Sequence, residues 1–140
     1  MNRKFERRLV LIAGVWQVIM GFLTIFVYAT HHRRQGLDMI YDAMPLPLIE
    51  AEAMNSLFGS IYMFIVTFGT LFVVLGVINL ILQTKIKDNK VEKKKPLFFL
   101  ICGIGTYFLM DLLSTILLVS ASILMLAKNK SIERLSHEKK

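Results

Sequence analysis

The sequence has a single cysteine, three prolines and almost no charge inside its apolar stretches. The lone Cys102 excludes an intramolecular disulfide and leaves the redox compartment open. No His or Cys pair has the spacing of a metal site, and no nucleophile, base and orienting group occur together. We therefore expect neither a cofactor nor enzymatic activity. The net charge is +7, but no basic face is interleaved with aromatic residues, which argues against a nucleic-acid partner.

The apolar residues form three long blocks separated by charged segments, and hydrophobic residues make up 55% of the 140 residues. A helix needs about 20 apolar residues to cross the hydrocarbon core of a membrane. The blocks are long enough for this, and the chain is short enough to be one domain. The composition therefore predicts an integral membrane protein of the all-α class.

The third block, from Leu97 to Ala127, is 31 residues long and has one charged residue, Asp111, at its midpoint. A single helix of this length would be about 46 Å long and would place the carboxylate at the centre of the bilayer. A chain that folds back at Asp111 avoids both problems, because the carboxylate then lies at the far interface. Asp111 could there cap the following helix. We predict a short hairpin that turns at Asp111.

These considerations predict four transmembrane helices in an antiparallel bundle, with the hairpin as the last two. A cleavable signal peptide is the alternative for the first span, but its apolar run is longer than the usual 7–15 residues. The predicted segments are spans 9–29, 56–82, 97–110 and 112–127, an extracellular loop 30–55, a cytoplasmic basic loop 83–96 and a cytoplasmic tail 128–140.

The positive charges are distributed unevenly. Of the 17 Lys and Arg residues, only Arg33 and Arg34 lie between the first and second spans. With four spans the other 15 share one side, which the positive-inside rule makes the cytoplasm. We therefore expect a multi-pass plasma-membrane protein with both termini in the cytoplasm. The flanking cations fix this topology or attract anionic lipid; they include Arg7, Arg8, Lys93, Lys94, Lys95, Lys128 and Lys130.

Small residues recur within the predicted spans at intervals that place them on one helix face. A spacing of seven residues is nearly two turns, and small side chains let a neighbouring helix approach closely. The pattern is typical of helix packing, either inside the bundle or between copies in an oligomer. Two polar residues at depth, Gln17 and Asn79, could bond across helices. The predicted packing residues are Gly14, Gly21, Gly69, Gly76, Gly103, Gly105, Ser114 and Ala121.

The predicted extracellular loop contains His31, His32, Asp38 and Asp42. Such side chains could surround a metal ion, but adjacent histidines point in different directions and no further His or Cys pair supports them. A solvated loop is the better interpretation.

The opening MNRKFERRLVLIAG is similar to the Arg-x-x-Glu-x-x-Leu start of a family of short Gram-positive bacterial membrane proteins, domain-of-unknown-function family 4064. The later segments KKKPLFFLICGIG and LLSTILLVSASILMLAKNK also resemble that family's basic loop and last two spans. The resemblance implies a small four-span plasma-membrane protein, and it brings no catalytic residues.

Three functions fit these observations. The leading hypothesis is a non-enzymatic accessory protein that binds another membrane protein. The second is an immunity-type protein that protects its host from a membrane-active toxin. The third is a small channel or transporter, which the lack of ionisable residues at membrane depth disfavours.

Overall fold

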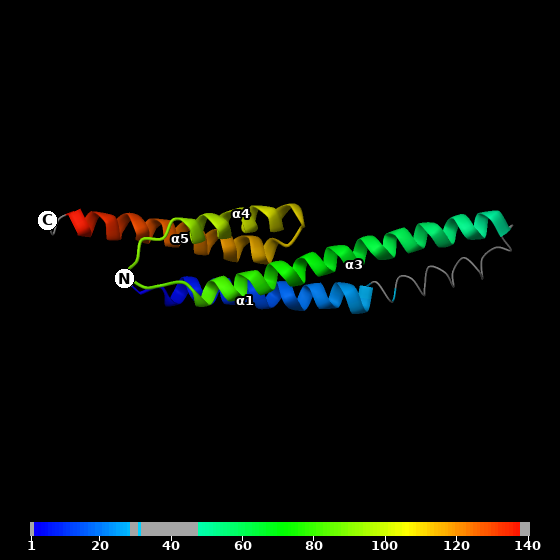
Figure 1. Ribbon diagram of the computed structural model, residues 1–140, viewed down its shortest axis with the longest axis horizontal. Coiled ribbons are helices and arrows are strands. Elements are labelled where there is room, and N and C mark those ends of the chain that lie inside the picture. Colours follow the sequence, from blue (N-terminus) through cyan, green and yellow to red (C-terminus); the bar gives the residue numbers. More distant parts are fainter. Residues whose placement is uncertain (1, 29–30, 32–47, 138–140) are drawn as a thin grey trace. The chain divides into compact units, whose positions relative to one another are not determined.

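The computed structural model describes residues 2–28, 31 and 48–137. The regular secondary structure of these residues is helical, and no strand occurs among them. Three helical stretches are long and apolar enough to cross a membrane: Lys4–Val27, Glu52–Thr84 and Leu112–Leu135. The described residues thus confirm the all-α prediction, and three of their helices are long and apolar enough to cross a membrane, as the composition predicts. The elements are α1 (Lys4–Leu23), the π-helical η1 (Thr24–Tyr28), α3 (Leu48–Thr84), α4 (Lys94–Phe108) and α5 (Leu112–His137) (Figure 1).

The helices differ in extent from the predicted spans. Helix α3 begins at Leu48, before the predicted start of its span at residue 56. Helix α5 runs on to His137, so the charged segment after Ala127 extends the helix and does not form a separate tail. Helix α4 has only 15 residues and is not among the stretches long enough to span. Most of the predicted extracellular loop, with His32, Asp38 and Asp42, lies outside the described residues.

The chain divides into two compact units, and the first comprises residues 1–17 and 75–140. Here α4 and α5 lie side by side and run in opposite directions (Figure 1). Near one end of the pair, Ser122 Oγ donates a hydrogen bond to the Pro96 carbonyl at 2.7 Å. Near the other end, the hydroxyls of Thr106 and Thr115 lie 3.1 Å apart. The core of this unit contains Val10, Ala13, Ile86, Phe99, Cys102, Leu118, Ala121 and Met125.

The turn between α4 and α5 is short and closed by backbone hydrogen bonds. The Leu109 N–H donates to the Gly105 carbonyl at 3.2 Å, and the Asp111 N–H donates to the Thr106 carbonyl at 3.0 Å. Between them, Met110 has a φ of 58°, in the left-handed region that non-glycine residues seldom occupy. The chain reverses there and α5 begins at Leu112.

The second unit, residues 18–74, contains the end of α1, η1 and most of α3. The backbones of α1 and α3 approach closely at Gly21 and Gly69. A Cβ added to Gly21 would lie 2.7 Å from the Gly69 carbonyl oxygen, and one added to Gly69 would lie 3.0 Å from that of Gly21. Large apolar side chains such as Phe26 and Phe64 are exposed on the outer faces. A hydrocarbon environment would cover such side chains.

Candidate functional site

The first unit contains a network of buried polar side chains at the end where α1 begins. Arg3 is fully buried, and its Nη2 donates to the Asn129 side-chain oxygen at 2.5 Å and to the Lys90 carbonyl at 2.9 Å. The backbone N–H of Arg3 donates to Asp88 Oδ1 at 2.8 Å. One residue before α1 thus contacts both the loop after α3 and helix α5.

Glu6 forms the second part of this network and is also fully buried. Its Oε1 lies 2.6 Å from the Lys128 ammonium, which donates to the Asn2 carbonyl at 2.7 Å. The next residue of α5 is Asn129, whose side-chain amide donates to the Glu92 carbonyl at 2.7 Å. We call Arg3, Glu6, Asp88, Lys128 and Asn129 the polar lock, because they join α1, the basic loop and α5.

Burying the charged residues of the polar lock has a cost in free energy. Removing a charged group from water costs several kcal/mol unless partners replace the lost hydration. Arg3, directly before α1, and Glu6, in its first turn, lie three residues apart and reach different partners. Since a buried ion pair demands one specific geometry, the lock holds three segments of the chain in a defined arrangement.

The cations predicted from the sequence fall into two groups. Four of them are in ion pairs, and the remaining three, Arg8, Lys94 and Lys130, have exposed side chains. Exposed ion pairs contribute little to stability, so the largely buried pairs of Lys128 with Glu6 and of Lys95 with Glu92 are the exceptions among the four. The pairs are Arg7 with Asp88 at 3.4 Å, Lys93 with Glu133 at 3.3 Å, Lys95 with Glu92 at 2.5 Å and Lys128 with Glu6 at 2.6 Å.

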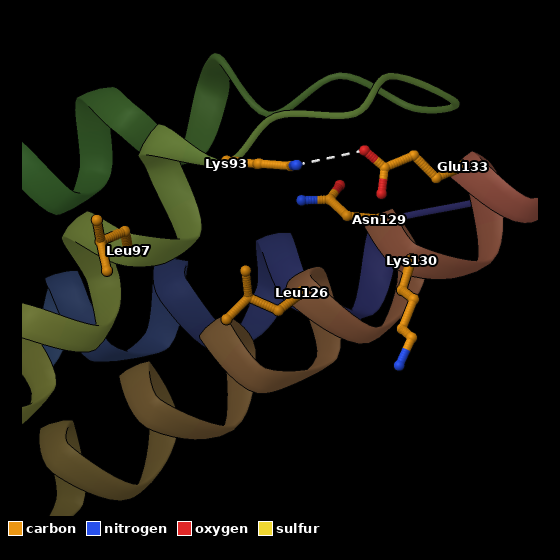
Figure 2. Close-up of a pocket in the computed structure, with 6 residues that line it drawn as sticks. All are labelled: Lys93, Leu97, Leu126, Asn129, Lys130 and Glu133. Carbon is orange, nitrogen blue, oxygen red and sulfur yellow. Dashed lines mark ion pairs between the residues drawn. The ribbon is translucent and has the colours of Figure 1, made fainter.

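A crevice of about 460 Å³ lies between the start of α4 and the charged part of α5. Its apolar side is formed by Leu97 and Leu126, and the Lys93–Glu133 ion pair lies across its other side (Figure 2). Lys130 extends away from that pair (Figure 2). The crevice therefore has an apolar wall and ammonium groups at its edge. A surface that contacts lipid headgroups is expected to have this combination.

A second polar site surrounds Asp111, between α4 and α5. Asp111 Oδ1 accepts hydrogen bonds from the Trp16 indole N–H at 3.2 Å and from the Ser114 N–H at 3.1 Å. The bond from Ser114 is a helix N-cap, and the Thr115 hydroxyl donates to the Asp111 carbonyl at 2.8 Å. Asp111 thus caps α5 and holds the turn against α1.

The residue after Trp16 on α1 is Gln17, and its fully buried side chain meets that of Asn79 on α3. The Asn79 amide donates to the Gln17 side-chain oxygen at 2.8 Å. The prediction that these two polar residues bond across helices is therefore confirmed.

The small residues occupy different environments. A Cβ added to Gly14 would lie 3.1 Å from the Gly76 carbonyl oxygen, and one added to Gly103 would lie 2.8 Å from Val119 Cγ2. Ser114 and Ala121 are fully buried. Gly105 differs, because an added Cβ would meet no atom within 4 Å. Gly105 therefore makes no close helix contact within the described chain.

Sequence analysis did not identify Arg3, Glu6 or Asn129 as functional, because charged and amide residues beside a span are usually solvated. One signal was present. The motif Arg-x-x-Glu-x-x-Leu falls on Arg3, Glu6 and Leu9, of which the two charged residues are fully buried and Leu9 packs against the core. The Trp16–Asp111 bond joins residues 95 positions apart, and no local pattern indicates such a pair.

Comparison with known proteins places the chain in a family. No curated protein and no solved structure matches it significantly. A family profile described as "Protein of unknown function" matches residues 2–109, which include the Arg3–Leu9 motif, α3 and α4 but not α5. Since the match covers well over half of the 140 residues, the chain belongs to the DUF4064 family of proteins of unknown function.

Proposed function

We propose that this chain is a non-enzymatic accessory protein of a bacterial plasma membrane that acts by binding another membrane protein. In this proposal its four helices are embedded in the bilayer as an antiparallel bundle, and both termini are cytoplasmic. Membership in the family and three helices apolar enough to span support the membrane location. The division of the cations into 15 and two supports the orientation.

The polar lock is the observation that carries the proposal. A chain that only needs to be anchored gains nothing from burying Arg3 and Glu6, since solvated charges would fix its topology equally well. The lock instead orders the basic loop and the charged part of α5 into one surface. A preorganised surface binds a partner at a lower entropic cost than mobile segments do. Arg8, Lys94 and Lys130 expose their charges on this end of the unit.

The orientation is tested by cysteine labelling in a chain that carries Cys102→Ala. Gln35→Cys and Arg134→Cys should react with a membrane-impermeant maleimide from opposite sides of the membrane. Arg134→Cys should react only in inverted vesicles, because the tail is expected inside. Its labelling in intact cells would contradict the proposed topology.

Partner binding is tested with a photo-crosslinking amino acid at Lys94 or Lys130 in living cells, and at exposed Phe64 as the matched control. We expect a crosslinked species with a second protein at the first two sites, and its loss on Arg3→Ala, which disrupts the lock. Crosslinks to lipid alone at all three sites would contradict an interaction function.

Anionic lipid is a second ligand that the crevice favours, because Lys93 and Lys130 lie at the edge of an apolar wall. Each cation near a membrane surface contributes about 1 kcal/mol to the attraction of anionic lipid. Thermal stability in nanodiscs should rise with anionic lipid and respond less in Lys130→Gln. Lys4→Gln, a change of another exposed cation, is the control. An equal response in all three chains would exclude specific binding at the crevice.

A further inference from the structure

The position of the α4–α5 turn relative to α1 carries an inference about membrane depth. Trp16 lies 12 residues after Lys4 and 11 before Val27, at the middle of the first candidate span. Its indole is bonded to Asp111 at 3.2 Å. The turn therefore lies level with Trp16 on α1.

The length of α4 agrees with this depth. Residues 97–108 follow the first turn of α4 and extend about 18 Å at 1.5 Å per residue. The hydrocarbon core is about 30 Å thick. Because Pro96 bonds to Ser122, the part of α5 paired with α4 runs from Ser122 to the turn, about 16 Å. Both arms of the pair thus reach little more than half of the membrane.

The opposite end of the pair is fixed by charge. Lys95 pairs with Glu92 directly before the apolar part of α4, and Lys128 pairs with Glu6 near the start of α1. These groups belong at or outside the interface, since charges in hydrocarbon cost about 2.5–3.5 kcal/mol each at the centre of a span. The pair consequently enters from the side that carries the polar lock and also returns to it.

A hairpin that crosses the whole membrane conflicts with these contacts. Its turn would lie at the far interface and would bring Trp16 there with it. The arms of about 18 Å and 16 Å would then leave roughly 12 Å of the hydrocarbon core uncrossed.

We infer that α4 and α5 form a re-entrant pair, which enters the membrane from the side of the polar lock and turns back at mid-depth, where Trp16 holds the tip through Asp111. That the lock side is cytoplasmic rests on the proposed function, whereas the depth does not. Asp111 then places a carboxyl group inside the hydrocarbon region. This proposal differs from the sequence-based prediction that Asp111 lies at the far interface.

The test measures depth in vesicles. A fluorophore is attached to Met110→Cys or to Phe108→Cys in a Cys102→Ala chain; both side chains are highly exposed, so neither change disturbs the core. Lys130→Cys is the interfacial control. Lipids with a nitroxide near the headgroup or near the end of the acyl chain act as quenchers. Trp16 is the single tryptophan and gives an internal reference.

We expect both turn positions and Trp16 to be quenched more strongly by the deep nitroxide, and Lys130→Cys by the shallow one. A turn that is quenched by the shallow nitroxide while Trp16 is quenched by the deep one would overturn the re-entrant pair and leave the proposed function intact. Quenching of Trp16 by aqueous iodide, and by neither lipid, would refute membrane insertion and with it both proposals.

Discussion

Helices α1 and α3 are joined differently in the two units of the chain. In residues 18–74 the contact at Gly21 and Gly69 depends on the absence of side chains, which lets the backbones approach. In the other unit the same two helices also approach closely at Gly14 and Gly76, but there Gln17 and Asn79 add a specific hydrogen bond. An apolar contact in a membrane tolerates any partner of the right shape, whereas a polar pair selects one register. The charged unit is therefore the part that specifies how the chain assembles.

Breaking the polar lock should have the largest effect. Arg3→Ala removes the partner of Asn129 and the bond to the Lys90 carbonyl, and it opens a space in the lock. Losing hydrogen bonds from a buried charged group costs about 1.5–3 kcal/mol, and the cavity left by the side chain adds to this cost. We expect a large drop in melting temperature in detergent. Lys4→Ala, which changes the exposed neighbour, should leave the melting temperature almost unchanged.

Gly21→Leu or Gly69→Leu should come next, because the side chain would occupy the space of the facing backbone. Overpacking typically costs about 1–3 kcal/mol. Gly59→Leu is the matched control on α3, since an added Cβ there meets nothing within 4 Å. Thermal melting of the three variants measures the effect. Equal melting temperatures would mean that the close approach contributes no stability.

A smaller loss is expected at Asp111. Asp111→Ala removes the cap of α5 and the acceptor for Trp16; loss of an N-cap costs about 1 kcal/mol, and removing a carboxyl group from the hydrocarbon offsets part of this loss. Asp111→Asn keeps an oxygen acceptor and should cost less. The emission of Trp16 should shift in the alanine variant more than in the asparagine variant. Identical emission in both variants and the native chain would argue that the indole bond does not form.

The smallest effect is expected for the pair of Gln17 and Asn79. Hydrogen bonds between membrane helices average about 0.6 kcal/mol in double-mutant cycles. Gln17→Leu, Asn79→Leu and the double variant should show a coupling of that size in denaturation experiments. A coupling above about 2 kcal/mol would mean that the pair is as important as the polar lock.

Much of the fold was predictable because it follows from local composition. The apolar blocks predicted the helices, and the single charge at Asp111 predicted a break, which the structure has between Phe108 and Leu112. The extension of α5 to His137 was not predicted, since a charged segment alone gives no reason for helix beyond its apolar part. It is helical where Lys128 and Asn129 find partners on α1 and the basic loop.

The candidate site was less predictable than the fold. The sequence indicates that Arg3 and Glu6 flank a span, and such residues normally stay in water. Their burial depends on Asn129 and Lys128, which are more than 120 positions away. Small residues were similarly ambiguous: Gly103 packs against Val119, while Gly105, two residues later on the same helix, faces open space. Only the partner helix decides which of two glycines matters.

The left-handed conformation of Met110 limits which chains can form this turn. For an L residue with a side chain, that conformation costs roughly 1–2 kcal/mol of free energy, and a β-branched residue clashes more severely. Asn89, the other non-glycine residue with positive φ among those described, belongs to a type that tolerates it. The hydrogen bonds that Asp111 makes on either side therefore hold the turn in a conformation that its own backbone disfavours. Met110 is therefore a point of backbone strain in the α4–α5 pair.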